Sequence, residues 1–306
     1  MNIFRAVARC VKDKNYRFAV FNKLGFYNNM PDEVYLTRKF KLSIGYDLDL
    51  HTPQTFNEKL QWLKLYDRNP QYTLMVDKYR VKDYVADKIG RQFIIPTIEV
   101  WDNPDDIDFS KLPNQFVLKC NHNSGLGMCI CKDKSKLDFH KVKAGLRKGL
   151  KQDYYLHGRE WPYKNVPRKI IAEEFMTDNK HDDLIDYKFM CFNGAAKCLF
   201  TCSDRRSASG LKVTFFDMDW NRLSFERHYH AANYPIYKPI NFNLMKELAE
   251  VLAKDMIFAR IDFYEINGKV YFGEITLHPG CGFEEFTPEE WDRILGNWIT
   301  LPDKSI

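Results

Sequence analysis

Two Asn-Gly pairs, each flanked by runs of aromatic, β-branched and other apolar residues, constrain the fold of this chain more than any other feature. Asn193-Gly194 separates residues 186–192 from 196–201, and Asn267-Gly268 separates residues 259–265 from 269–275. Asn-Gly is a preferred sequence for the two-residue turn of a β-hairpin, because both central positions of that turn need a positive φ. We therefore predict two antiparallel hairpins in the C-terminal half of the chain.

Helical patterns accompany these hairpins, and together they predict an α+β fold. Residues 1 to about 70 favour helices, and Thr55 with Glu58 matches a capping box at the start of one of them. Further helices are predicted at 75–89, 138–155 and 242–256, and further strands at 92–100, 115–120, 128–131, 169–176 and 212–217. A glycine-bearing turn, residues 121–127, joins two of these strands as a third hairpin.

The composition excludes several classes of protein. The 306 residues are 45% hydrophobic and 28% charged, as in a soluble globular protein, and no apolar run reaches the roughly 18 residues of a membrane span. A net charge of +5 suits an anionic substrate but is too small for a nucleic-acid groove, so no nucleic-acid partner is expected. None of the eight cysteines has CxxC spacing, which predicts free thiols in the cytoplasm.

The first residues are basic and only partly apolar. Arg5, Arg9, Lys12 and Lys14 interrupt the apolar stretch that a signal peptide would need. Two interpretations stay open: an amphipathic helix on the protein surface, or weak docking of that helix on the anionic inner face of the membrane.

Two carboxylates sit within the last predicted hairpin. Asp262 and Glu274 lie on either side of the Asn-Gly turn, twelve residues apart, so that they fall beside each other on adjacent strands. Alternation along the first strand places Arg260 on the same face as Asp262. Two facing carboxylates repel unless a cation separates them, and Mg²⁺ prefers one or two carboxylates together with phosphates. The alternative is a pair of solvated strand charges.

The glycine turn has the features of a phosphate lid. Lys119 ends an apolar strand, and Ser124, Gly125 and Gly127 expose backbone N–H groups without bulky side chains. An ordinary glycine hairpin is the alternative.

The strand at 169–176 ends in Glu173-Glu174-Phe175-Met176, which suits the hinge of a purine site: acids for ribose hydroxyls and apolar groups for the base. A strand meeting solvent would look the same. Lys188 lies within an apolar strand, where a lysine needs an anion unless its amine reaches solvent.

The order of these motifs resembles the ATP-grasp superfamily, and the match is best with its teichuronopeptide-biosynthesis (TupA-like) branch, over roughly residues 30–285. The motifs are, in chain order, Thr55-Phe56-Asn57-Glu58-Lys59-Leu60-Gln61-Trp62, Met75-Val76-Asp77-Lys78-Tyr79-Arg80, Phe116-Val117-Leu118-Lys119, Asn123-Ser124-Gly125-Leu126-Gly127, Ile171-Ala172-Glu173-Glu174-Phe175-Met176, Asp186-Tyr187-Lys188-Phe189, Arg260-Ile261-Asp262 and Phe272-Gly273-Glu274-Ile275-Thr276. The chain departs from the family at Thr276, where Asn is usual, which leaves the number of bound metal ions open.

The resemblance implies a nucleotide held between two α+β subdomains with antiparallel sheets. It divides the chain into a helical region at 1–70, an ATP-grasp domain at 71–290 and a tail at 291–306. The domain would comprise a lid subdomain at about 112–176 and a metal-binding subdomain at about 184–285.

ATP and Mg²⁺ are the implied cofactors. The implied nucleotide-binding residues are Lys78, Lys119, Ser124, Gly125, Gly127, Glu173, Glu174, Phe175, Met176 and Lys188. The implied metal ligands are Asp262, Glu274 and Thr276, and the implied catalytic residues are Arg260 and Lys188.

The resulting hypothesis is an ATP-dependent carboxylate–amine ligase that works through an acyl phosphate in bacterial cell-surface polysaccharide or peptide-polysaccharide biosynthesis. Its substrates would be a carboxylate-bearing sugar or amino acid and an amine. Arg205, Arg206 and His278 are candidate substrate-binding residues. One alternative is a glycosyltransferase with Asp217-Met218-Asp219 as its metal motif, and another is a binding module without catalytic activity.

Overall fold

The largest sheet has five antiparallel strands and contains both predicted Asn-Gly hairpins. The computed structural model describes residues 9–178, 184–204, 207 and 210–303. The strand order is β10 (Lys269–Thr276), β9 (Phe258–Ile266), β5 (Asp186–Phe192), β6 (Ala195–Ser203) and β7 (Lys212–Asp217). Asn193 and Asn267 adopt φ of 47° and 49°, and the glycine after each is also at positive φ, so both hairpin predictions are confirmed.

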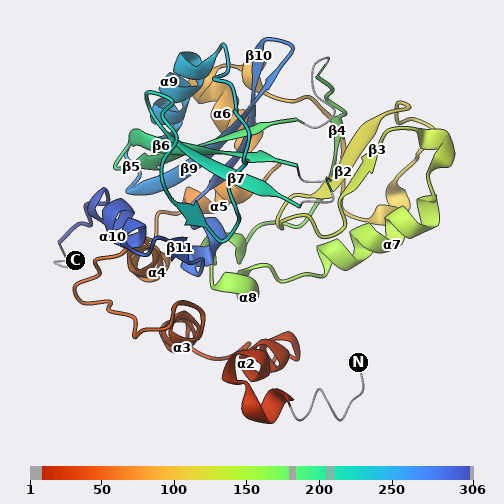
Figure 1. Cartoon of the computed structure of the whole chain (residues 1–306). Helices are drawn as coiled ribbons and strands as arrows, with labels where there is room; N and C mark the ends of the chain where they lie inside the picture. The colour runs from red at the N-terminus through yellow and green to blue at the C-terminus, as the bar shows by residue number, and fades with distance from the viewer. Residues whose placement is uncertain (1–8, 179–183, 205–206, 208–209, 304–306) are drawn as a thin grey trace.

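Helices cover both faces of this sheet (Figure 1). One face packs against α5 (Tyr72–Val76), α6 (Val81–Ile89) and α9 (Phe242–Ala253), through side chains such as Phe189 and Phe263. The other face packs against α4 (Phe56–Tyr66) and α10 (Glu290–Asn297), through Phe192 and Phe258. Alternation along β5 and β9 places Lys188 and Asp262 on this second face, beyond the end of its apolar part.

A smaller sheet stands beside the first, at the right of Figure 1. Its antiparallel order is β1 (Thr97–Trp101), β4 (Ile170–Glu174), β2 (Phe116–Cys120) and β3 (Cys129–Cys131). The helix α7 (Phe139–Leu150) packs on it through Leu146, which meets Leu118 in a separate core. Two α+β units with antiparallel sheets therefore face each other, although β1 lies before the predicted start of the lid subdomain.

The remaining elements surround this pair. At the N-terminal end are α2 (Lys14–Lys23) and α3 (Asp32–Ile44), at the bottom of Figure 1. The short elements are α8 (Tyr155–Gly158), β8 (Glu226–Arg227) and β11 (Phe286–Thr287), of which β8 and β11 pair with each other. The capping box of Thr55 and Glu58 is present at the start of α4. None of the helices in the described part of the chain combines the length and apolarity that crossing a membrane requires.

Three predicted element boundaries are wrong. The helix predicted at 138–155 ends at Leu150. The helix predicted at 75–89 is divided into α5 and α6, because the side chain of Asp77 accepts hydrogen bonds from the backbone N–H groups of Tyr79 and Arg80 and interrupts the helix. The strand predicted at 92–100 begins only at Thr97, after a short 3₁₀ turn. Residues 291–306, predicted as a tail, contain most of α10, which packs closely on α4.

Candidate functional site

A cavity of about 850 Å³ is lined by residues from both sheets. The predicted site residues that line it are Lys78, Lys119, Ser124, Glu173, Glu174, Phe175, Met176, Lys188, Arg260, Asp262 and Glu274. These residues come from seven separate stretches of sequence, and the fold brings them to one place.

A bulge at Gly273 places the two predicted metal ligands opposite each other. The Asn267-Gly268 turn pairs Phe272 with Phe263, and continued regular pairing would set Glu274 opposite Ile261, on the other face of the sheet. The register instead shifts between Phe272 and Glu274, so that Glu274 pairs with Asp262. Gly273 is the extra residue, and a Cβ there would lie 3.1 Å from the backbone oxygen of Asp262.

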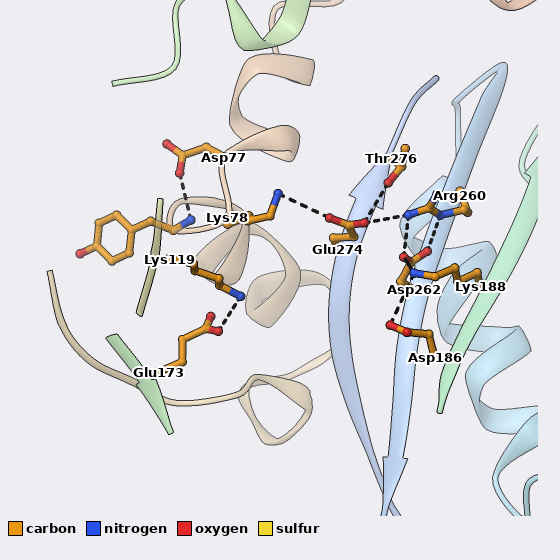
Figure 2. Close-up of polar contacts among 11 residues, drawn as sticks. Asp77, Lys78, Lys119, Glu173, Asp186, Lys188, Arg260, Asp262, Glu274 and Thr276 are labelled. Carbon is orange, nitrogen blue, oxygen red and sulfur yellow. Dashed lines mark hydrogen bonds and ion pairs between the residues drawn. The ribbon is translucent and has the colours of Figure 1, made fainter. Parts of the chain in front are cut away.

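Basic side chains hold these carboxylates together (Figure 2). Arg260 donates to both oxygens of Asp262 at 2.7 Å and, through Nη2, to Glu274 Oε1 at 2.7 Å. Lys188 forms an ion pair with Asp262, and its Nζ lies 3.5 Å from Asp186 Oδ1. Thr276 donates from Oγ1 to Glu274 Oε1 at 3.4 Å.

Neighbouring opposite charges set the ionisation of Glu274 and Lys188. Burial by itself would raise the pKa of Glu274, but Lys78, Arg260 and Lys188 together lower it well below its ordinary value. Burial would likewise lower the pKa of Lys188, yet the adjacent Asp262 carboxylate raises it above the ordinary value. Glu274 is therefore an anion and Lys188 a cation at neutral pH, the states that binding a metal ion and a phosphate requires.

Lys78 reaches this cluster because the chain breaks between α5 and α6. Asp77, which causes the break, also accepts a hydrogen bond from Asn121 Nδ2 at 2.8 Å. The backbone N–H of Lys78 donates to the carbonyl of Asn121 at 3.0 Å, which ties this segment to the end of β2. The Nζ of Lys78 then lies 3.5 Å from Glu274 Oε2. The helix break that sequence periodicity missed is thus what presents Lys78 to the cavity.

Glu173 is shared between two lysines. Its carboxylate is 7% exposed and lies 2.5 Å from Lys119 Nζ and 2.6 Å from Lys82 Nζ. Lys82 also donates to the carbonyl of Ile95 at 2.8 Å and to Thr97 Oγ1 at 2.7 Å. Burial favours the neutral acid, but the two lysines lower the pKa of Glu173 below its ordinary value. Sequence analysis missed Lys82.

The glycine turn lies between β2 and β3, as predicted. Gly125 and Gly127 have φ of 81° and 83°. A Cβ on Gly127 would lie 2.7 Å from the carbonyl of Gly145 in α7, so this glycine permits close packing of the turn on the helix. Asn123 anchors the turn by donating to the carbonyls of Leu126 and Gly149. Ser124 is the residue of the turn that lines the cavity.

The predicted hinge follows β4 along the cavity wall. The backbone N–H of Glu174 donates to the carbonyl of Pro96 at 3.2 Å, and the Glu174 side chain is exposed. Phe175 and Met176 are half-buried and line the cavity. This places an acid and two apolar side chains on the cavity wall, next to Thr177, whose carbonyl accepts a hydrogen bond from Asn267 in the turn before β10.

The structure does not bring every candidate to the cavity. His278 is 4% exposed, absent from the cavity wall, and lies with Nδ1 3.3 Å from Glu160 Oε2. Thr276 does not line the cavity; it pairs with Arg260 across the sheet and donates to Glu274. Arg205 and Arg206 lie outside the described residues. Asp217 caps a turn by accepting from the N–H groups of Asp219 and Asn221, and neither it nor Asp219 lines the cavity.

Comparison with known families decides the assignment. The model of the TupA-like ATP-grasp family matches residues 58–300, most of the chain and all of the cluster described above. The chain belongs to the TupA-like ATP-grasp family. This confirms the predicted family and fold. No curated protein matches the sequence.

Solved ATP-grasp structures are similar at low identity. D-Alanine–D-alanine ligase from Bacillus anthracis, complexed with ATP, is 14% identical over 67% of this chain and 54% of its own, with a TM-score of 0.40. The Helicobacter pylori enzyme is 15% identical over 82% and 71%, with a TM-score of 0.44. N5-carboxyaminoimidazole ribonucleotide synthetase from Thermus thermophilus is 12% identical over 67% and 45%, with a TM-score of 0.38. The chain thus spans about half the length of the first of these enzymes.

The residues present fit Mg²⁺. Among the described residues, no group of three His, Cys, Asp or Glu side chains gathers as a complete metal site. Mg²⁺ however usually takes one or two protein carboxylates and completes its shell with phosphates and water. Asp262 and Glu274, opposite each other on the cavity wall, supply that pair.

Proposed function

We propose that this chain is an ATP-dependent carboxylate–amine ligase that works through an acyl phosphate. The observation that carries the proposal is the position of Lys78, Lys188 and Arg260 around the facing pair Asp262 and Glu274, on the wall of a cavity lined from both sheets. Paired carboxylates held by three cations suit a metal-bound polyphosphate next to a second substrate.

Different residues of the cavity wall act in the two steps of the proposed reaction. An oxygen of the substrate carboxylate attacks the γ-phosphorus of ATP and ADP leaves; the amine then attacks the acyl carbon, phosphate leaves, and the amine gives up a proton. Lys78, Lys119 and Lys188 neutralise the phosphate oxygens during the first step. Arg260 contacts the acyl phosphate and the oxyanion of the second step. Mg²⁺ held by Asp262 and Glu274 supplies further positive charge at the phosphates.

The glycine turn protects the intermediate. An acyl phosphate is hydrolysed by water, so the site must exclude water between the two steps. The turn at 121–127 stands over the cavity from the smaller sheet, with Ser124 facing it. We assign it the role of the lid; Asn123 anchors the turn, and Gly127 permits its close packing on α7.

We also propose a biological role for this reaction. We place the reaction in the synthesis of a bacterial cell-surface polysaccharide or peptide-polysaccharide, at the cytoplasmic side where ATP is available. The substrates would be a uronic acid or amino acid as carboxylate and an amine. A weak contact of the basic N-terminal region with the inner face of the membrane would bring the enzyme near such products.

Hydroxylamine tests the ligase without knowledge of the natural amine. It opens an acyl phosphate to a hydroxamate, which is detected as a coloured iron complex. Purified protein with Mg-ATP, hydroxylamine and a panel of uronic acids and amino acids should release ADP and form hydroxamate with at least one acid. Lys119→Ala should abolish both signals and the rise in melting temperature that Mg-ATP causes, which corresponds to about 2.7 kcal/mol of stabilisation at 100 times the dissociation constant.

The competing glycosyltransferase hypothesis predicts a different result in the melting-temperature experiment. The Asp217-Met218-Asp219 triplet, its proposed metal motif, is a capped turn away from the cavity. A melting-temperature rise with a UDP-sugar but not with Mg-ATP would reject the ligase in favour of sugar transfer. A protein that responds to neither ligand would be a binding module.

A further inference from the structure

The cavity continues from the Arg260 cluster over an apolar floor to a second guanidinium group. Phe200 and Cys202 of β6 pair with Phe215 and Val213 of β7, and all four side chains line the cavity. The guanidinium of Arg260 lies 5.7 Å from the centre of the Phe200 ring. Arg227 lines the cavity in the same region, from β8, with its guanidinium 5.4 Å from the ring of Phe286 in β11.

Arg227 is held in place but incompletely satisfied. The residue is 4% exposed, and its Nη2 donates to the carbonyl of Pro279 at 2.7 Å. Its Nε is buried and makes no hydrogen bond within the described part of the chain. The nearest acid is Glu284, whose Oε2 lies 3.4 Å from Nε in a contact that is an ion pair but not a hydrogen bond. A buried guanidinium N–H without an acceptor is costly, and a planar carboxylate is its natural partner.

Glu284 is suited to leave that position. Its side chain is 28% exposed, whereas that of Arg227 is 3% exposed. Gly280, at φ 58°, lies against Glu284, and any Cβ at position 280 would overlap its carboxyl group. Pro279 lies three positions after Thr276, the last residue of β10, so the Arg227 end of the cavity is connected through Leu277 and His278 to the strand that carries Glu274.

We propose that Arg227 binds the free carboxylate of the acceptor, which makes the acceptor an amino acid or peptide whose amine faces the Arg260 cluster. This inference rests on the proposed ligase function and specifies its second substrate. The apolar floor takes the carbon skeleton between amine and carboxylate. Before the acceptor binds, the Glu284 carboxylate is paired with Arg227, and the acceptor carboxylate displaces it.

The test compares amino acids with their primary amides as acceptors. Using an acid that gives hydroxamate, we would replace hydroxylamine by each of the twenty L-amino acids, D-alanine, D-glutamate, and short peptides, and measure ADP release. An active acceptor should lose at least about tenfold in kcat/KM when its carboxylate is converted to the amide, because the amide cannot form the charged pair.

Two variants assign this preference to Arg227. Arg227→Lys keeps the charge but loses the planar fork, and should raise the KM for the acceptor at least about tenfold while the hydroxylamine reaction is unchanged. Glu284→Gln removes the competing carboxylate and should lower the acceptor KM, the opposite direction. An unchanged melting temperature and Mg-ATP response would show that Arg227→Lys is folded.

The outcomes separate the two proposals. Hydroxamate formation without any active amino acid or peptide, or equal activity of acids and amides, would overturn the role of Arg227 and leave the ligase standing. An Arg227→Lys variant that slows the hydroxylamine reaction as much as the acceptor reaction would also overturn it. Absence of hydroxamate with every acid would remove the ligase proposal, and the acceptor proposal with it.

Discussion

Lys82 is predicted to keep Lys119 available for ATP. Both lysines contact Glu173, at 2.6 Å and 2.5 Å, and the carboxylate is almost fully buried. When Lys119 turns to a phosphate, Lys82 still neutralises Glu173. In Lys82→Met, Glu173 has Lys119 as its remaining ion-pair partner among the described residues, so ATP binding must break that pair.

The expected loss of stability in Lys82→Met follows from the contacts that Lys82 makes. Loss of one partner from a buried ion pair costs about 3–5 kcal/mol, reduced here because Lys119 remains. The substitution also removes two hydrogen bonds from a charged donor, to Ile95 and Thr97. We expect Lys82→Met to destabilise the protein by about 2–4 kcal/mol, or about 4–8 °C in melting temperature. ATP should bind about tenfold more weakly, the effect of about 1.4 kcal/mol.

The assay is thermal unfolding and ATP titration of four proteins: wild type, Lys82→Met, Glu173→Gln and the double variant. Lys88→Met, at an exposed position of the same helix, is the matched control and should change stability by less than about 0.5 kcal/mol. If Glu173 couples the two lysines, the double variant recovers ATP affinity relative to Lys82→Met. Additive losses in the double variant would refute the reasoning.

Three further predictions concern other parts of the molecule. Glu274→Gln should reduce ADP release by about 100-fold or more, since it removes one of two facing carboxylates, and should also lower the melting temperature, because Lys78 and Arg260 lose an ion-pair partner; near-normal turnover would exclude Glu274 from the metal site. Gly296→Ala should lower the free energy of unfolding by about 2–4 kcal/mol, because the new Cβ overlaps the carbonyl of Gln54 where α10 meets α4. Gly145→Ala, whose Cβ meets no atom closer than 3.9 Å, should raise it by about 0.5–1 kcal/mol. Equal effects of the two substitutions in denaturant titrations would contradict this account of the packing. Burial lowers the pKa of His278 below its ordinary 6.5, so the unfolded chain binds more protons than the folded one. The free energy of unfolding should therefore fall as pH drops below 6.5, by at most about 1.4 kcal/mol per pH unit for this group. Urea titrations at several pH values should show a weaker pH dependence of this free energy for His278→Gln, and an identical pH dependence would contradict the prediction.

The sequence by itself determined the hairpins, the family and several of the charged residues that line the cavity. The Asn-Gly turns act through local φ preferences, and the capping box at Thr55 acts within one helical turn, so both are readable from neighbouring residues. The paired acids and the lysines at strand ends are also local signals, and their order along the chain identified the ATP-grasp family. These features need no knowledge of what packs against them.

Tertiary structure decided what depends on contacts between distant segments. The bulge at Gly273 shifts the register by one residue and thereby places Glu274 opposite Asp262; the spacing of twelve alone would leave the two on opposite faces. Asp77 interrupts the helix and bonds Asn121, 44 positions along the chain, which presents Lys78. Lys82 and Arg227 line the cavity but belong to no motif that the sequence analysis recognised. His278 contacts Glu160, a residue 118 positions earlier that only the folded chain brings next to it. Local propensity fixes which elements form, whereas the pairing of buried charges is decided by which segments the fold brings together.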